Sequence, residues 1–125
     1  MSEGVSASRQ SKLNKSHGKA FEARIKRELK ELGSYIYSGT KGDVVAGKYI
    51  VECKYSSGWF RLGMFKDFLG QAKNNAKWWH SQGDPKQWLI ALTGGGKSGT
   101  VICMDKDEFL HLWKKAYGNE HPSSN

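Results

Sequence analysis

Two carboxylates and one ammonium stand close together in the middle of the chain, at Asp43, Glu52 and Lys54. Between them, Gly47 and Lys48 fit a two-residue hairpin turn of type II′, in which glycine takes the first position. Such a turn sets Asp43 directly opposite Glu52, and directly opposed residues share one face of a sheet. Side chains alternate along a strand, so Lys54 lies on the same face as Glu52. The pattern therefore predicts that all three charged groups converge.

Opposed carboxylates destabilise a hairpin unless something neutralises them. A hard divalent cation can do so, and oxygen ligands suit Mg²⁺, which keeps several waters and accepts phosphate oxygens. The alternative is that Glu52 and Lys54 lie on a solvated sheet face, since Glu-x-Lys alone recurs by chance in many proteins. The apolar residues Ile50 and Val51 predict instead a central strand, where charged side chains are more often functional.

Helical and strand patterns alternate around this hairpin. Phe21, Ile25, Leu29 and Leu32 form one helical stripe that Gly33 closes, with the helix expected to begin near Ser16. Strands are expected over residues 35–39, on both sides of Gly47 within residues 41–58, and over residues 87–93 and 100–104. Further helices are expected over residues 60–82 and from about residue 105 to residue 118. The expected fold class is α/β, a single domain with a central mixed β-sheet flanked by helices.

Composition favours a small basic domain with a polyanionic partner. The chain has 125 residues, and 20 Lys and Arg against 12 Asp and Glu give a formal net charge of +8. Nucleic acid is the commonest polyanion, although the charge could also serve solubility alone. No apolar run approaches the length of a membrane span, and Cys53 and Cys103 fit free thiols of a reducing compartment. We therefore expect a cytoplasmic protein with no membrane partner.

The two ends of the chain differ in composition from the middle. Residues 1–16 are rich in serine and basic residues, which predicts a flexible basic arm, and residues 119–125 are expected to form a disordered tail. No small-molecule cofactor is expected. The glycine-rich segment 94–99 precedes a strand pattern rather than a helix, so it does not fit a phosphate-binding loop.

The order and spacing of several motifs over residues 17–80 resemble the PD-(D/E)xK nuclease superfamily, and in finer detail the archaeal-type Holliday junction resolvases. HGKAFEARI is similar to their first helix with its Glu, Ser38-Gly39 to their serine-bearing loop, GDVVAG to their metal-binding Asp strand, and IVECK to their E-x-K strand. Gly42 stands where the family has proline before the Asp. The resemblance implies a restriction-endonuclease-like αβββαβ core, with the nuclease domain over residues 17–118.

The resemblance also implies roles for five residues in phosphodiester hydrolysis. Asp43, Glu52 and the Cys53 carbonyl would ligate Mg²⁺, or Mn²⁺ in its place, with Glu22 as a further metal-site residue. Lys54 would position the attacking water or offset charge in the transition state. Geometry alone leaves Glu22 and Glu28 equally close to the apolar stripe, and the resemblance selects Glu22.

Gln71 resembles the glutamine of the family's next helix. It borders the apolar stripe of residues 60–82 and would orient Lys54 or a water, although a surface amide remains the alternative. The implied substrate is a four-way DNA junction and the implied assembly a homodimer, because paired incision needs two-fold geometry. Trp59, Phe60 and Trp78 are candidates for the dimer interface.

DNA contacts are expected from residues of the arm and of the rim of the site. These are Arg9, Lys12, Lys15, Lys19, Ser38, Lys41, Arg61, Lys66 and Lys73. Two alternatives stay open beside the resolvase interpretation. One is another nicking or restriction-type nuclease of the same superfamily, and the other is a catalytically inactive DNA-binding module that keeps the fold.

Overall fold

The protein is described here by a computed structural model that covers residues 2–37, 42–56, 62–95 and 99–118. Its elements in chain order are α1 (Ser2–Glu31), β1 (Val44–Ala46), β2 (Tyr49–Tyr55), α2 (Leu62–Ser81), β3 (Gln87–Thr93), β4 (Thr100–Met104) and α3 (Lys106–Tyr117). The four strands form one sheet in the order β1-β2-β3-β4. The pairs β1–β2 and β3–β4 are antiparallel, and β2–β3 is parallel. The predicted α/β domain with a mixed sheet and flanking helices is confirmed.

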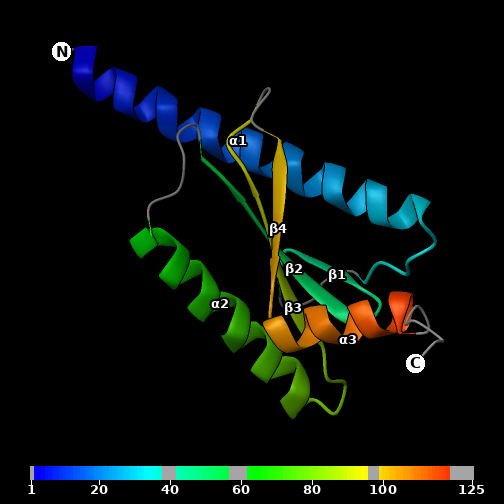
Figure 1. The fold of residues 1–125 in the computed structure, drawn as a ribbon. Coiled ribbons are helices and arrows are strands. Elements are labelled where there is room, and N and C mark those ends of the chain that lie inside the picture. Colours follow the sequence, from blue (N-terminus) through cyan, green and yellow to red (C-terminus); the bar gives the residue numbers. More distant parts are fainter. Residues whose placement is uncertain (1, 38–41, 57–61, 96–98, 119–125) are drawn as a thin grey trace.

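Helices α1 and α2 cover opposite faces of the sheet (Figure 1). Alternation along the strands creates two cores. On one face, Phe21 and Ile25 of α1 pack with Val44, Val51 and Ala91. On the other face, the core residues are Val45, Ile50 and Trp79 of α2. Strand β2 is internal to the sheet, as the apolar run around Glu52 predicted.

The β1–β2 hairpin has the predicted register, with Val44 opposite Val51. Gly47, the first residue of the turn, has a φ of 58°, whereas no described residue other than glycine has a positive φ, so Lys48 does not. A positive φ at the first turn position alone agrees with the predicted type II′ turn. Lys86 holds this turn from the start of β3. Its buried Nζ donates to the Gly47 carbonyl at 2.6 Å and to the Tyr37 hydroxyl at 3.0 Å. The turn is therefore fixed from outside as well as by its own sequence.

Two expectations at the N-terminal side are wrong. Helix α1 begins at Ser2, so residues 2–16 are helical rather than a flexible arm, and Ser16 lies inside the helix. Once the packed part of a helix has formed, each added residue gains a hydrogen bond without a new nucleation cost. The N-terminal end of α1 extends beyond the sheet (Figure 1). The expected boundary between an arm and a domain thus falls within one continuous helix.

Of the strand expected over residues 35–39, the described residues 35–37 form a single bridge between Ile36 and Ala46, and residues 38–39 lie outside the described part of the chain. Tyr37 donates its backbone N–H to Val45 at 2.9 Å, and Gly47 donates to Tyr35 at 3.0 Å. These bonds run along the outer edge of β1, whose three residues are all buried. The segment therefore covers the edge of the sheet without forming a full strand.

The C-terminal elements follow the predicted boundaries closely. Asp105 caps α3, and its side chain accepts a hydrogen bond from the Asp107 N–H at 2.9 Å. Lys48 at the hairpin turn lies 3.8 Å from Glu108 of α3. Tyr49 of β2 donates its hydroxyl to the same carboxylate. Within the described residues, no helix combines the length and apolar character that crossing a bilayer requires. The tail at residues 119–125 lies outside the described residues.

Candidate functional site

Asp43 and Glu52 meet on the face of the sheet that α2 covers. The pairing of Val44 with Val51 places Asp43, one residue before β1, opposite Glu52 of β2. Glu52 is only 1% exposed, and the Asp43 carboxyl is close enough to act on it directly. Asp43 Oδ2 accepts the backbone N–H of Cys53 at 2.8 Å, which fixes its side chain against β2. The convergence that the hairpin register predicted is present.

The two oxygens of Glu52 have different surroundings. Asn75 of α2 donates its amide to Oε1. Oε2 is fully buried and accepts no hydrogen bond from any described residue. Burial, and after it the neighbouring Asp43 carboxyl, raise the pKa of Glu52 above its ordinary value. The site therefore holds a buried carboxylate oxygen that needs either a proton or a cation.

Lys54 lies beside Glu52 on the same face and is held by α2. Its Nζ donates to Gln71 Oε1 at 2.6 Å and stands 5.1 Å from the centre of the Phe68 ring. The positive charge of Lys54 lowers the pKa of Glu52 in part, without cancelling the effect of burial. Gln71 thus orients Lys54, which is one of the two roles that the resemblance implied for it.

Glu22 approaches the site from α1, on the other face of the sheet. Burial first and the Asp43 carboxyl second raise the pKa of Glu22, so the two side chains lie near each other. Within the described part of the chain, however, no three His, Cys, Asp or Glu side chains are close enough to hold one metal ion. Glu22 therefore adjoins the Asp43–Glu52 pair but does not complete a three-carboxylate cluster with it. An effect through water fits this geometry better than direct ligation.

Cys53 offers its backbone rather than its thiol. The side chain packs into the core under α1, and burial raises the pKa of the thiol so that it stays protonated. Its N–H points to the Asp43 side. The N–H and C=O of one strand residue face the same neighbour in an antiparallel pair, so the carbonyl also faces the side of Asp43.

Asp43, Glu52 and Gln71 line a cavity of about 970 Å³ between the end of the β1–β2 hairpin and α2, whereas Lys54, Cys53 and Glu22 are not part of its lining. Asn75 and Trp78 line it but were not among the predicted site residues. Asn75 is four residues after Gln71 and so occupies the same face of α2, a spacing that could have identified it. The lining residues are Gly42, Asp43, Glu52, Lys66, Asp67, Gly70, Gln71, Asn74, Asn75 and Trp78.

Gly42 shapes the entry to Asp43. Its φ is +107°, which only glycine adopts without strain, and an added Cβ would lie 2.9 Å from Ile50 Cγ2. Proline, which fixes φ near −65°, does not fit this backbone. The departure from the family motif at this position is therefore matched by the local conformation.

The basic residues expected to contact DNA are dispersed. Lys66 is exposed and lines the cavity, whereas Lys73 is exposed on α2 outside the lining set, and Lys19 is exposed on α1 near Glu22. The predicted residues Ser38, Lys41 and Arg61, and the interface candidates Trp59 and Phe60, lie outside the described residues. Arg9, Lys12 and Lys15 lie on the N-terminal half of α1, where the structure describes only the backbone.

The chemistry of the site follows from its own geometry. A carboxylate pair of which Glu52 is buried, an oriented ammonium and an adjoining open polar cavity can hold a hard cation next to an anionic substrate. Either a proton or such a cation would relieve the unsatisfied Oε2 of Glu52 and the repulsion from Asp43. Comparisons of the chain with models of protein families, with curated proteins and with solved structures found no match.

Proposed function

We propose that the chain is a metal-dependent DNA endonuclease that hydrolyses phosphodiester bonds at four-way junctions. The observation that carries the catalytic part is the buried, unsatisfied Oε2 of Glu52 beside the Asp43 carboxyl. A carboxylate pair of this kind is unfavourable in an isolated fold and is useful when it binds a cation. The junction specificity rests on the resemblance of the motifs over residues 17–80.

Asp43, Glu52 and the Cys53 carbonyl supply the oxygens that would hold Mg²⁺, with Mn²⁺ as an alternative. When bound, such an ion polarises a phosphoryl oxygen and acidifies a water. The residues present fit this ion, because hard oxygen donors are offered and the single nearby thiol is turned into the core. Asn75 fixes one oxygen of Glu52, and the other accepts no hydrogen bond from a described residue.

Lys54 supplies a positive charge at a fixed position. Its ammonium is held by Gln71, so it needs no rearrangement to attract the attacking water or to stabilise negative charge on the phosphorus centre. The water provides the nucleophile, and the 3′ or 5′ oxygen of the deoxyribose leaves. Glu22 orders solvent at the edge of Asp43.

The substrate must reach a cavity at the surface of a basic protein. A net charge of +8 favours a polyanion, and Lys66 lies at the cavity itself. We propose a homodimer, because two sites related by a two-fold axis can cut opposed strands of a junction. Trp78, 40% exposed at the cavity, is the described candidate for a contact with a second subunit or with an unpaired base.

The test incubates the protein with Mg²⁺ and three DNAs of matched sequence: a four-way junction, a Y-shaped fork and a linear duplex. Symmetric incisions confined to the junction, absent in Asp43→Asn, support the proposal. Cleavage of linear duplex at equal rates would indicate a less selective nuclease. Binding without any cleavage in Mg²⁺ or Mn²⁺ would indicate an inactive DNA-binding module.

A further inference from the structure

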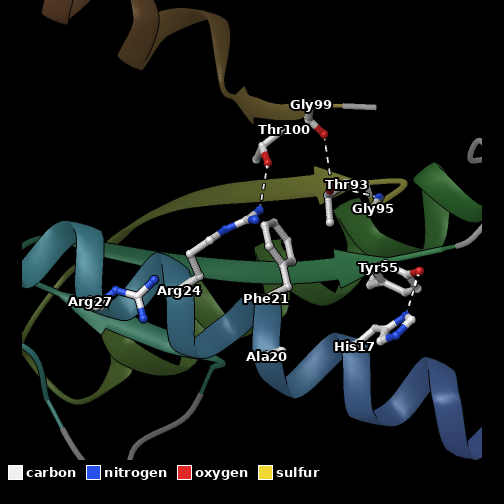
Figure 2. A pocket seen from close by; sticks show the side chains of 10 residues that line it. All are labelled: His17, Ala20, Phe21, Arg24, Arg27, Tyr55, Thr93, Gly95, Gly99 and Thr100. Carbon is white, nitrogen blue, oxygen red and sulfur yellow. Dashed lines mark hydrogen bonds between the residues drawn. The ribbon is translucent and has the colours of Figure 1, made fainter. Parts of the chain in front are cut away.

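A second cavity lies on the opposite face of the sheet, between α1 and the ends of β2, β3 and β4. Its volume is about 550 Å³. Figure 2 shows Phe21 and Arg24 extending from α1 toward β3 and β4, with His17 and Tyr55 meeting beside them. The lining residues are His17, Ala20, Phe21, Arg24, Arg27, Tyr55, Thr93, Gly95, Gly99 and Thr100.

The periodicity of α1 explains how one helix lines this cavity and also brings a carboxylate near Asp43. Successive residues are rotated by about 100° around a helix axis. With the buried Phe21 at the centre of the stripe, Glu22 falls on one flank, toward Asp43. Arg24 and Arg27 fall on the other flank, toward β3 and β4. The second cavity is therefore basic because of the side of α1 that it meets.

The arginines of this cavity have uncompensated charge within the described structure. Arg24 Nη2 donates to Thr100 Oγ1 at 3.3 Å, and neither Arg24 nor Arg27 forms a salt bridge with a described carboxylate. The ten lining residues include no Asp or Glu. Guanidinium groups remain charged at any physiological pH, so the cavity carries a permanent positive charge that an anion can neutralise.

Several other polar groups of the lining are fixed by hydrogen bonds to one another. The His17 ring nitrogen Nδ1 and the Tyr55 hydroxyl share a hydrogen bond of 2.8 Å. The Thr93 hydroxyl accepts the Gly95 N–H at 3.1 Å and donates to the Gly99 carbonyl at 2.9 Å. Gly95 presses against Tyr55, since an added Cβ would lie 2.8 Å from its ring. The groups that face an incoming anion are thus held in place beforehand.

We propose that this cavity binds a backbone phosphate of the DNA strand that the Asp43–Glu52 site cuts. The choice of DNA rests on the proposed function. Tyr55 of the cavity directly follows Lys54 of the candidate site, and their side chains point to opposite faces at the end of β2. A strand that passes around this end of the sheet therefore meets both sites in succession, and phosphate contacts of this type position a substrate without reading its sequence.

A free nucleotide fits the same cavity less well, because the Phe21 ring is buried and the other two rings of the lining pack against each other. Phe21 is 4% exposed, and the Arg24 guanidinium stands 5.3 Å from the centre of its ring. The rings of His17 and Tyr55 meet edge to face at 4.9 Å. The phosphate alone, rather than a nucleoside, matches what the cavity offers.

The test compares three variants that each lower the net charge by one. Arg24→Gln removes the guanidinium, and Thr100→Glu places a carboxylate next to it. Lys30→Gln is the matched control, since Lys30 is exposed on the face of α1 turned away from Phe21. The affinity for a four-way junction and for a linear duplex is measured by fluorescence anisotropy at several salt concentrations, without divalent cations so that no strand is cut. Thermal melting checks that each variant is folded.

We expect Arg24→Gln and Thr100→Glu to weaken binding on the order of tenfold, and each to reduce the slope of log affinity against log salt by about one. Lys30→Gln should leave the slope unchanged. Equal effects of all three variants on DNA binding would overturn the proposal. It would also be overturned if pyrophosphate raised the melting temperature of the wild type but not of Arg24→Gln, while Arg24→Gln bound DNA as tightly as the wild type. This experiment measures binding and not cleavage. A protein that binds DNA through the cavity but fails to cut it would contradict the proposed function and not this inference.

Discussion

Replacing Glu52 by glutamine tests whether the candidate site stores an unfavourable charge pair. The substitution keeps the shape of the side chain, so the carbonyl can still accept from Asn75. The new amide nitrogen takes the place of the unsatisfied Oε2 and can donate to the Asp43 carboxylate. We therefore expect Glu52→Gln to abolish cleavage and at the same time to stabilise the fold.

The size of the stabilisation follows from the hairpin geometry. Opposed residues have Cβ atoms about 5 Å apart, and two unit charges at that distance repel by about 3 kcal/mol at an effective dielectric constant near 20. Lys54 offsets part of this repulsion. A net gain of about 1–2 kcal/mol at neutral pH corresponds to a rise in Tm of roughly 4–10 °C for a domain of this size.

The gain depends on pH in a defined direction. Burial and Asp43 raise the pKa of Glu52 in the folded chain above 4.5, so the folded chain holds this proton more tightly than the unfolded chain does. The contribution of the Glu52 proton to the free energy of unfolding is therefore fully present below about pH 4.5, and it is lost as the pH rises through the raised pKa of Glu52. Glu52→Gln has no such group to titrate, so it does not lose stability in this way. The difference in free energy of unfolding between Glu52→Gln and the wild type should therefore grow from pH 4 toward neutrality.

Thermal melting at several pH values, with and without Mg²⁺, measures both effects. Mg²⁺ should raise the Tm of the wild type, since a ligand of the folded state stabilises it, and should have little effect on Glu52→Gln. Glu28→Gln is the control, because Glu28 is an exposed carboxylate on α1. A Glu52→Gln variant that is less stable than the wild type at pH 7, or that cleaves DNA, would refute the reasoning.

Four further changes test three other parts of the structure. Lys54→Met should lower the cleavage rate at saturating DNA by at least about a hundredfold. Gln71→Ala should lower the rate less, because Gln71 acts through Lys54. A larger effect of Gln71→Ala than of Lys54→Met in rate assays would contradict this order. Gly42→Ala should destabilise the fold by about 1–3 kcal/mol in chemical denaturation, because of its positive φ and the contact with Ile50, and an unchanged midpoint would argue against that backbone. Deleting residues 1–15 should lower the helical signal in circular dichroism. It should also reduce the slope of log DNA affinity against log salt by up to about three counterions. An unchanged slope would show that this half of α1 does not contact DNA.

The part of the site that could be predicted from the sequence is the part made by local structure. Asp43 and Glu52 are joined by a two-residue turn, so alternation along the strands is enough to place them together. The same argument gave the register of the hairpin and the side of Lys54. Gln71 needed the resemblance, because its distance from Lys54 along the chain carries no local signal.

The remainder depends on contacts between distant segments. The partnership of Asn75 with Glu52 and the meeting of Tyr55 with His17 arise only when α1 and α2 pack on the sheet. The polar N-terminal segment gave no apolar periodicity, so the extension of α1 to Ser2 had no pattern to reveal it. Intrinsic helix propensity is a weak guide to whether such a segment is helical, since it differs among ordinary residues by only tenths of a kcal/mol.

Helix α1 connects the Asp43 carboxyl with the second cavity, because Glu22, near Asp43, and Arg24, in the cavity, lie on opposite flanks of its buried stripe. A roll of the helix about its axis lowers one flank toward the sheet and lifts the other. Occupants of the two flanks therefore bias the same degree of freedom, and by thermodynamic reciprocity each must change the affinity of the other by the same factor. Titrating Mg²⁺ into the wild type and into Arg24→Gln, each with and without an uncleavable oligonucleotide, measures the part of that factor that depends on Arg24, and equal factors in the two proteins would mean that the two flanks are not coupled.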